Sequence, residues 1–230
     1  MQPAFSIVKT LVPIAGSDQG FPVRRIFCVA RNYAEHAKEM GGTGREAPFF
    51  FTKPADAVLP APIGGEGAMS YPPKTADLHH EIELVVALGL GGRNIAAEDA
   101  GRHIYGYAVG LDMTRRDLQA ELKKLGRPWD VAKGFDQSAP IGPIHRATAV
   151  GPLERGAIRL EVNGVERQRG DLADMIWSVP EIVAILSEYF ELQAGDLLFT
   201  GTPAGVGPVQ RGDRLVGSVD GIGQLSVRIV

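Results

Sequence analysis

The sequence predicts a β-rich α+β fold with short peripheral helices. Its 29 glycines and 16 prolines are scattered through 230 residues, which divides the chain into short strands and turns. From residue 79 onward, short apolar runs alternate with segments of helical periodicity. No linker separates a second folding unit, so we expect an N-terminal arm over residues 1–20 and a single domain over residues 21–230.

The first third of the chain is expected to be largely extended. Residues 25–31 form an apolar run typical of a strand, and Asn32 is a candidate N-cap for a helix that ends near Met40, before two glycines. The aromatic run at 49–52 predicts another strand. A stretch rich in proline and glycine follows over 54–73 and is expected to be irregular.

The remaining elements are justified by periodicity and by turn and capping signals. An Asn-Gly pair at 163–164, flanked by alternating apolar residues, predicts a β-hairpin over 159–168. Ser178 and Glu181 form a capping box that opens a helix to about Tyr189. The other expected elements are strands at 81–89, 105–112, 196–200, 213–219 and 222–229, and helices at 96–103 and 115–125.

Composition favours a small-molecule protein. The net charge is −3 and the chain has no basic run, which argues against nucleic-acid or membrane-surface binding. No apolar stretch approaches the roughly 18 residues of a membrane span, so we expect a soluble, cytoplasmic protein. The single cysteine, Cys28, rules out an internal disulfide and is expected to be a buried core thiol.

Two carboxylates at the entrance of an apolar strand form the strongest functional signal. Glu81 and Glu83 are two residues apart, so in a strand their side chains share a face and repel each other unless a cation lies between them. Asp112 ends a later apolar strand and is the expected third ligand. Three carboxylates favour Mg²⁺, Mn²⁺ or Ca²⁺ over zinc. The alternatives are glutamates that face solvent or pair with arginines, and a site that includes His79.

His36 and Glu39 are the candidates for general-base chemistry. They are three residues apart on the predicted helix, where a carboxylate can hold an imidazole in one tautomer and raise its basicity. The alternative is an ordinary ion pair on an exposed helix face.

Further candidates for substrate contact follow the expected metal ligands. Arg116 and Gln119 are also three residues apart on a helix, and Lys133 occurs in a mostly apolar run, where an ammonium could stabilise an enolate oxygen. The loop at 200–207 offers backbone donors and a hydroxyl to an anion. It lacks the Gly-Lys-Ser/Thr ending of a phosphate-binding loop, so no nucleotide cofactor is expected.

Several of these segments together resemble the fumarylacetoacetate hydrolase superfamily, in its short acylpyruvate hydrolase branch. They occur in family order between residues 24 and about 225. The matching segments are Arg31-Asn-Tyr-Ala-Glu-His36, Phe51-Thr-Lys-Pro54, His79-His-Glu-Ile-Glu83, Gly110-Leu-Asp-Met-Thr114, Arg116-Asp-Leu-Gln119, Ala132-Lys-Gly-Phe135 and Thr200-Gly-Thr-Pro-Ala-Gly-Val-Gly207.

The resemblance implies a mixed β-roll, a homodimer, and Mg²⁺ or Mn²⁺ bound by Glu81, Glu83 and Asp112. It implies that His36 and Glu39 activate a water on a helix that orders as a lid. The remaining site residues that it implies are catalytic Lys133 and the substrate-binding residues Arg31, Arg116, Gln119, Gly201 and Thr202.

The activity implied by the resemblance is hydrolysis of a carbon–carbon bond in a 2,4-dioxo acid. Local matches at 27–32, 48–53 and 170–177 favour fumarylpyruvate, an intermediate of gentisate degradation, as the 2-oxo acid substrate. A different acyl arm and oxaloacetate decarboxylation are the alternatives, because both use the same metal-stabilised enolate. A metal-dependent protein that binds carboxylates without turnover is a more remote alternative.

Overall fold

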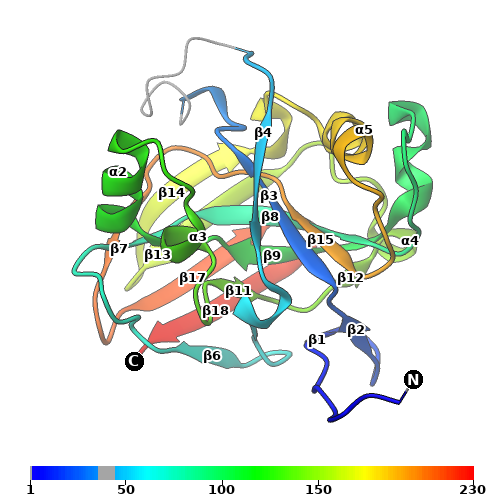
Figure 1. The fold of residues 1–230 in the computed structure, drawn as a ribbon. Coiled ribbons are helices and arrows are strands. Elements are labelled where there is room, and N and C mark those ends of the chain that lie inside the picture. Colours follow the sequence, from blue (N-terminus) through cyan, green and yellow to red (C-terminus); the bar gives the residue numbers. More distant parts are fainter. Residues whose placement is uncertain (1, 36–44) are drawn as a thin grey trace.

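The computed structural model describes residues 2–35 and 45–230, and two large β-sheets form its body (Figure 1). The larger sheet has the strand order β4, β3, β15, β8, β9, β11, β5, with β12 added on β9. Its β3–β15 and β5–β11 pairs are parallel and the others antiparallel, so the sheet is mixed. Its strands are β3 (Arg25–Ala30), β4 (Phe49–Lys53), β5 (Val58–Pro60), β8 (Ile82–Leu88), β9 (Ile104–Leu111), β11 (Ala139–Ile141), β12 (His145–Arg146) and β15 (Asp196–Phe199).

The second sheet has five strands, and two small sheets complete the β structure. The five strands run in the order β14 (Val165–Asp171), β13 (Ala157–Val162), β17 (Arg214–Val219), β18 (Gly223–Ile229) and β6 (Glu66–Met69). One small sheet pairs β1 (Leu11–Pro13) with β2 (Gly20–Pro22). The other contains β10 (Thr114–Arg115), β7 (Leu78–His80) and β16 (Gly207–Val209).

The helices are short and lie at the periphery of the sheets (Figure 1). This arrangement confirms the predicted β-rich α+β fold with short peripheral helices. The helices are α2 (Arg116–Lys124), α3 (Asp130–Lys133), α4 (Ala147–Val150) and α5 (Val179–Tyr189), with 3₁₀ turns η1 (Ala55–Ala57), η2 (Ala97–His103) and η3 (Leu172–Asp174). None of the helices in the described part of the chain is long and apolar enough to cross a membrane.

Strand β8 lies at the centre of the core and is buried along its whole length. Ile82 and Leu84 belong to the core cluster that also contains the inner residues of the five-stranded sheet. Val85 and Ala87 point the other way, into a second cluster that includes Cys28 and residues of the β1–β2 ribbon. Because both faces of β8 are covered, its sequence is continuously apolar instead of alternating.

The local signals in the second half of the sequence are confirmed. Asn163 and Gly164 have φ values of 53° and 78°, as a tight turn between β13 and β14 requires. At the start of α5 the Glu181 carboxylate accepts a hydrogen bond from the Ser178 backbone N–H at 2.9 Å, which completes the capping box. The helix predicted at 96–103 is observed as the 3₁₀ turn η2.

Two expectations for the first half need correction. Asn32 does not cap a helix through its side chain, because its amide bonds to Trp177 and to the carbonyl of Thr200, at 2.8–2.9 Å. The remainder of that predicted helix, including His36, Glu39 and the two terminating glycines, lies outside the described residues. The stretch at 54–73 contains β5 and β6, whose partner strands β11 and β18 lie far away in the sequence.

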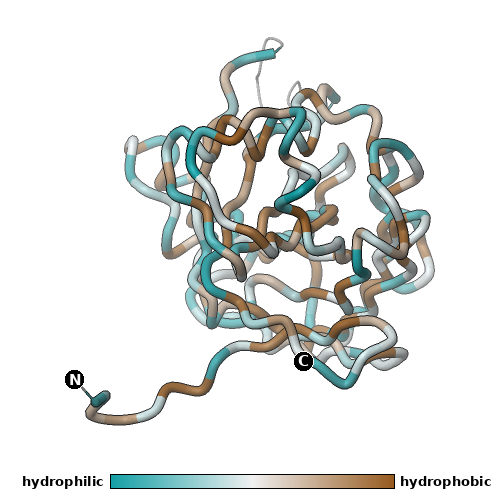
Figure 2. The backbone as a smooth tube through the Cα atoms, turned by 90° about the vertical axis from the view of Figure 1, so that its right-hand side faces the viewer, coloured by the Kyte–Doolittle hydropathy of each residue, from teal (hydrophilic) through white to brown (hydrophobic). Residues whose placement is uncertain are grey.

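The chain before β1 runs away from the body of the protein (Figure 2). Phe5, Ile7 and Val8 are exposed there. From Val12 onward the ribbon is packed, and Val12 and Phe21 are buried against the large sheet. The division of the chain at residue 20 stays a prediction.

A buried carboxylate joins β15 to β3 at one end of the large sheet. Asp196 has no exposed side-chain surface and accepts from Arg24 at 3.1 Å, from Arg25 at 2.8 Å and from the Gln193 backbone N–H at 2.9 Å. Removing one partner of such a group leaves buried charges and donors without compensation.

We therefore expect Asp196→Ala to lower the free energy of unfolding by about 3–5 kcal/mol in urea titrations followed by circular dichroism. Asp99→Ala is the matched control, because Asp99 pairs with Arg102 at 2.8 Å on an exposed surface and should change stability by less than about 1 kcal/mol. Equal, small effects of the two substitutions would contradict the role given to Asp196.

Candidate metal and substrate site

The pairing of β8 with β9 brings the three predicted carboxylates together. Ile82 is the partner of Leu111 in this antiparallel pair, so the preceding Glu81 lies opposite the following Asp112. The Asp112 backbone N–H donates to the carbonyl of Glu81 at 2.8 Å, which extends the ladder by one residue beyond both strands. Glu83 lies on β8, two residues further along. The strand register therefore decides which acidic side chains meet.

The three carboxylates form a compact, buried cluster of oxygen atoms. One oxygen from each of Glu81, Glu83 and Asp112 lies within 4.8 Å of the others, and all three residues are buried. Asp112 Oδ1 is buried and accepts no hydrogen bond from the described residues, although Lys53 Nζ lies 2.8 Å away. Three hard oxygen donors at this spacing fit a divalent ion of the Mg²⁺ or Mn²⁺ type.

Three cationic side chains surround the carboxylates. Lys133 Nζ lies 2.9 Å from Glu81 Oε2 and 2.7 Å from Asp112 Oδ2. Lys53 reaches Asp112 from the end of β4, and Arg116 bonds to Glu81 Oε1 from the first turn of α2. Because the carboxylates and their counter-ions are buried together, removing any one of them leaves an uncompensated charge.

Burial and neighbouring charges change the proton affinities of these groups in characteristic directions. Burial raises the pKa of Glu83 well above its usual range, and the negative charges of Asp112 and Glu81 raise it further. For Lys133, burial acts to lower the pKa, but Asp112 and Glu81 outweigh it, so the net shift is upward. Lys133 is therefore an ammonium at neutral pH. A divalent cation at the triad would favour the ionised form of Glu83.

The Arg116 side chain is hydrogen-bonded to three neighbouring side chains of the site. Its guanidinium donates to Glu81, to the Gln119 side-chain oxygen and to His79 Nδ1, the last at 3.3 Å. His79 in turn contacts Asp77 at 2.9 Å, and it is not part of the acidic cluster. This arrangement holds Glu81 in place and uses the donors of Arg116 within the site.

The predicted residues Arg31, Arg116, Gln119, Lys133 and Thr202 line a small cavity over the triad, of about 30 Å³. Arg31 has a φ of 57°, and its buried Nε has no hydrogen-bond partner among the described residues. Gly201 donates its backbone N–H to Glu83 Oε2 at 2.7 Å, so it positions a carboxylate. His36 and Glu39 lie outside the described residues, and their pairing stays a prediction.

Sequence reasoning missed two residues of the site. Lys53 is fully buried against Asp112, and Thr114 Oγ1 donates to Glu81 Oε1 at 3.2 Å. Lys53 follows three phenylalanines and a threonine in an apolar strand, which is the same signal that singled out Lys133. Thr114 carried no such signal.

A third missed residue, Gln168 on β14, connects the second sheet to the site. Its Oε1 accepts from the Ile82 backbone N–H at 3.0 Å and contacts His80 Nδ1 at 2.9 Å. Its Nε2 donates to the Pro203 carbonyl and to Thr202 Oγ1, both at 2.8 Å. The two backbone partners fix which end of the amide is oxygen.

This network determines the tautomer of His80 and the donor role of the Thr202 hydroxyl. Because Gln168 Oε1 is an acceptor, His80 carries its proton on Nδ1. Because Thr202 Oγ1 accepts from Gln168, the Thr202 hydroxyl proton is left for another acceptor. Thr202 lines the cavity over the triad, so its O–H is available as a donor to a bound ligand.

With this geometry established, the chain can be compared with known proteins. The family profile described as "Fumarylacetoacetate (FAA) hydrolase C-terminal" matches residues 25–230. The chain therefore belongs to the fumarylacetoacetate hydrolase family, as the sequence motifs predicted. The match confirms the predicted class of enzyme, a hydrolase that acts on carbon–carbon bonds in ketonic substances.

Individual relatives carry two activities. A fumarylpyruvate hydrolase from Ralstonia sp is 45% identical over 184 residues, which cover 80% of this chain and 93% of that protein. Oxaloacetate tautomerase YcgM from Escherichia coli (strain K12) is 42% identical over 202 residues, which cover 87% of this chain and 90% of that protein. Similarity at this level assigns the family and leaves the substrate to the chemistry of the site.

A solved structure shows the same fold with a metal. The crystal structure of fumarylpyruvate hydrolase from Pseudomonas aeruginosa in complex with Mn²⁺ and pyruvate matches with a TM-score of 0.97 and 55% identity, covering 100% of this chain and 99% of that chain. The Mn²⁺ of that relative agrees with the predicted Mg²⁺ or Mn²⁺ cofactor and with the buried acidic triad found here.

The Gln168 network yields a stability prediction. Gln168→Leu leaves the Ile82 N–H and the Pro203 carbonyl buried without partners, so the free energy of unfolding should fall by about 3 kcal/mol. The control is Gln224→Leu, which changes an exposed glutamine on β18. Urea titration of both variants measures the difference, and a change below about 0.5 kcal/mol in Gln168→Leu would contradict a structural role for the amide.

Proposed function

We propose that this protein is a metal-dependent hydrolase that converts fumarylpyruvate to fumarate and pyruvate. The observation that carries the proposal is the position of Lys133, whose ammonium lies between two carboxylates of the acidic triad and lines the cavity above it. This places a fixed positive charge next to a site suited to a divalent ion. The Mn²⁺ and pyruvate bound by the 55% identical relative support the same assignment.

Glu81, Glu83 and Asp112 would hold the ion. When bound, Mg²⁺ or Mn²⁺ supplies a Lewis acid for the 1-carboxylate and 2-oxo group of the substrate. Arg116, Lys53 and the backbone N–H of Gly201 hold the three carboxylates in their orientations. In metal sites, hydrogen bonds of this kind orient the side chains that bind the ion.

Cleavage requires stabilisation of negative charge on the pyruvyl fragment. Water adds to C4 of the dioxo acid, the C3–C4 bond breaks, and its electron pair forms the enolate of pyruvate while fumarate leaves. Lys133 is placed to stabilise the enolate oxygen, and the outward O–H of Thr202 can donate to the same fragment. Protonation at C3 completes pyruvate.

The attacking water needs a base. We propose that His36, oriented by Glu39, accepts the proton from water as it adds to C4. Arg31, whose buried Nε lacks a partner among the described residues, is placed to bind a carboxylate of the substrate. The gentisate pathway and a homodimer belong to this proposal through the family resemblance, and a cytoplasmic location belongs to it as an expectation from the sequence.

A second candidate is keto–enol chemistry on oxaloacetate. The 42% identity to oxaloacetate tautomerase YcgM favours it, and an enolate next to Lys133 serves that reaction as well. Tautomerisation needs no attacking water but moves a proton at C3, so the two activities differ in the proton that a base such as His36 would accept.

The test compares fumarylpyruvate, acetylpyruvate and oxaloacetate with Mn²⁺ and again after chelation. We expect release of pyruvate from fumarylpyruvate to be at least about tenfold faster than from the others, to disappear with chelator, and to be lost in His36→Ala while Mn²⁺ affinity is retained. The matched control is His145→Ala, a histidine on β12 outside the site cavity.

Tautomerisation releases no pyruvate, so it is followed separately through the ultraviolet absorbance of the oxaloacetate enol. Faster enol–keto conversion of oxaloacetate than hydrolysis of fumarylpyruvate would replace the proposed reaction by the second candidate. Full hydrolysis by His36→Ala would remove that residue from the mechanism.

A further inference from the structure

A second, larger cavity lies next to the cavity over the triad. Its volume is about 390 Å³, and it is lined by Phe49, Phe50, Phe51, Thr52, Arg127, Pro128, Trp129, Asp130 and Lys133. Phe51, Trp129 and Lys133 line both cavities. The two cavities are therefore adjacent, and the other end of a ligand anchored at the triad can point past these side chains toward the outer cavity.

Aromatic rings form the walls between the two cavities. Trp129 meets Phe49 and Phe51 edge to face, with ring centroids 5.6 and 6.0 Å apart. Lys133 Nζ lies 5.1 Å from the centroid of the Phe51 ring, so the aromatic wall begins at the ammonium. Flat rings held in this way favour a flat, conjugated chain over a bulky or branched one.

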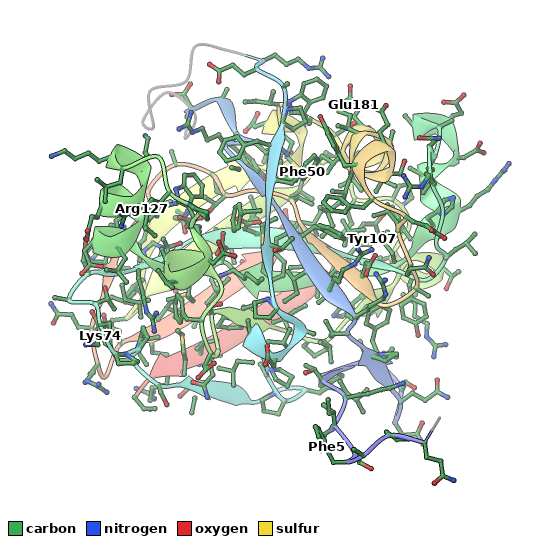
Figure 3. The ribbon with its side chains drawn as sticks, viewed as in Figure 1. Phe5, Phe50, Lys74, Tyr107, Arg127 and Glu181 are labelled. Carbon is green, nitrogen blue, oxygen red and sulfur yellow. The ribbon has the colours of Figure 1, made fainter. Side chains whose placement is uncertain are left out.

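Arg127 supplies a cation to the outer cavity, at the connection between α2 and α3 (Figure 3). Its backbone is fixed, because its N–H donates to the Leu122 carbonyl at 2.9 Å after Gly126 turns the chain at a φ of 62°. The guanidinium makes no hydrogen bond or ion pair with the described residues. The Arg116 guanidinium, by contrast, donates to Glu81, Gln119 and His79.

The charged side chains that line the two cavities indicate the charge of the ligand. Four cationic side chains line them, Arg31, Arg116, Arg127 and Lys133, and four acidic ones, Glu81, Glu83, Asp112 and Asp130. Lys53, whose ammonium lies 2.8 Å from Asp112, adds a further positive charge behind the triad, so positive charge is in excess once a divalent cation is bound. A ligand that carries more than one negative charge complements this excess. One of its carboxylates belongs at the triad, and the outer cation available for the second is Arg127.

We propose that the outer cavity is the subsite for the acyl arm of the substrate and that Arg127 binds the distal carboxylate of that arm. The inference rests on the proposed function, which it deepens by naming the arm as a flat, unsaturated chain that ends in a carboxylate. Arg116 does not serve this role, because its donors are used by Glu81, Gln119 and His79.

The first test measures kcat/KM of Arg127→Gln on fumarylpyruvate and on acetylpyruvate, which lacks the distal carboxylate. Loss of a charge-assisted hydrogen bond should lower kcat/KM for fumarylpyruvate by about ten- to a hundredfold, mainly through KM, and change it less than about twofold for acetylpyruvate. Arg127→Lys should recover part of the loss. The matched control is Arg93→Gln, an exposed arginine that lines neither cavity.

A second measurement separates this inference from the proposed function. Fumarate itself should bind the Mn²⁺-loaded protein, and calorimetry should show about a tenfold weaker affinity in Arg127→Gln and an unchanged one in Arg93→Gln. If fumarylpyruvate is not hydrolysed but fumarate binding depends on Arg127, the reaction is wrong and the subsite stands. If Arg127→Gln leaves both the substrate preference and fumarate binding unchanged, the subsite is overturned.

Discussion

The structure depends on placing three carboxylates side by side in the interior. Such a cluster is unfavourable by itself, because burial and mutual repulsion both oppose ionisation, as the raised pKa of Glu83 shows. The protein offsets this with cations that are themselves buried, Lys53 and Lys133, and with donors aimed at individual carboxyl oxygens. An arrangement this demanding is retained where it serves a function, and a divalent ion is the ligand that its charge and oxygen donors select.

Each part of the fold contributes to that arrangement. The register of β8 and β9 sets Glu81 opposite Asp112, and the sheets on either side bury the pair of strands. The end of β4 and the short helix α3 bring the two lysines, while β14 of the second sheet brings Gln168. Residues distant in sequence therefore act on one small volume, and the outer cavity opens between β4 and the α2–α3 connection.

The sequence predicted the elements with local signals and the residues with an unusual local context. The Asn-Gly turn, the capping box and the apolar strands carry their own signals, and Glu81, Glu83 and Lys133 stand out because charges interrupt apolar runs. Strands β5 and β6 were missed because they are only three and four residues long, lie in a stretch rich in proline and glycine, and pair with partners distant in the sequence. Gln168 and Arg127 were missed because nothing in their local sequence distinguishes them, and only the fold brings Gln168 to Thr202 and Arg127 to the outer cavity.

The most direct measurement is a crystal structure of the protein grown with Mn²⁺, with anomalous scattering recorded at the manganese absorption edge. The account predicts one strong peak, about 2.1 Å from a carboxyl oxygen of each of Glu81, Glu83 and Asp112, with Lys133 Nζ beside the cavity that the ion faces. A peak at other residues, or a triad occupied only by Lys53, Lys133 and Arg116 at saturating Mn²⁺, would contradict it.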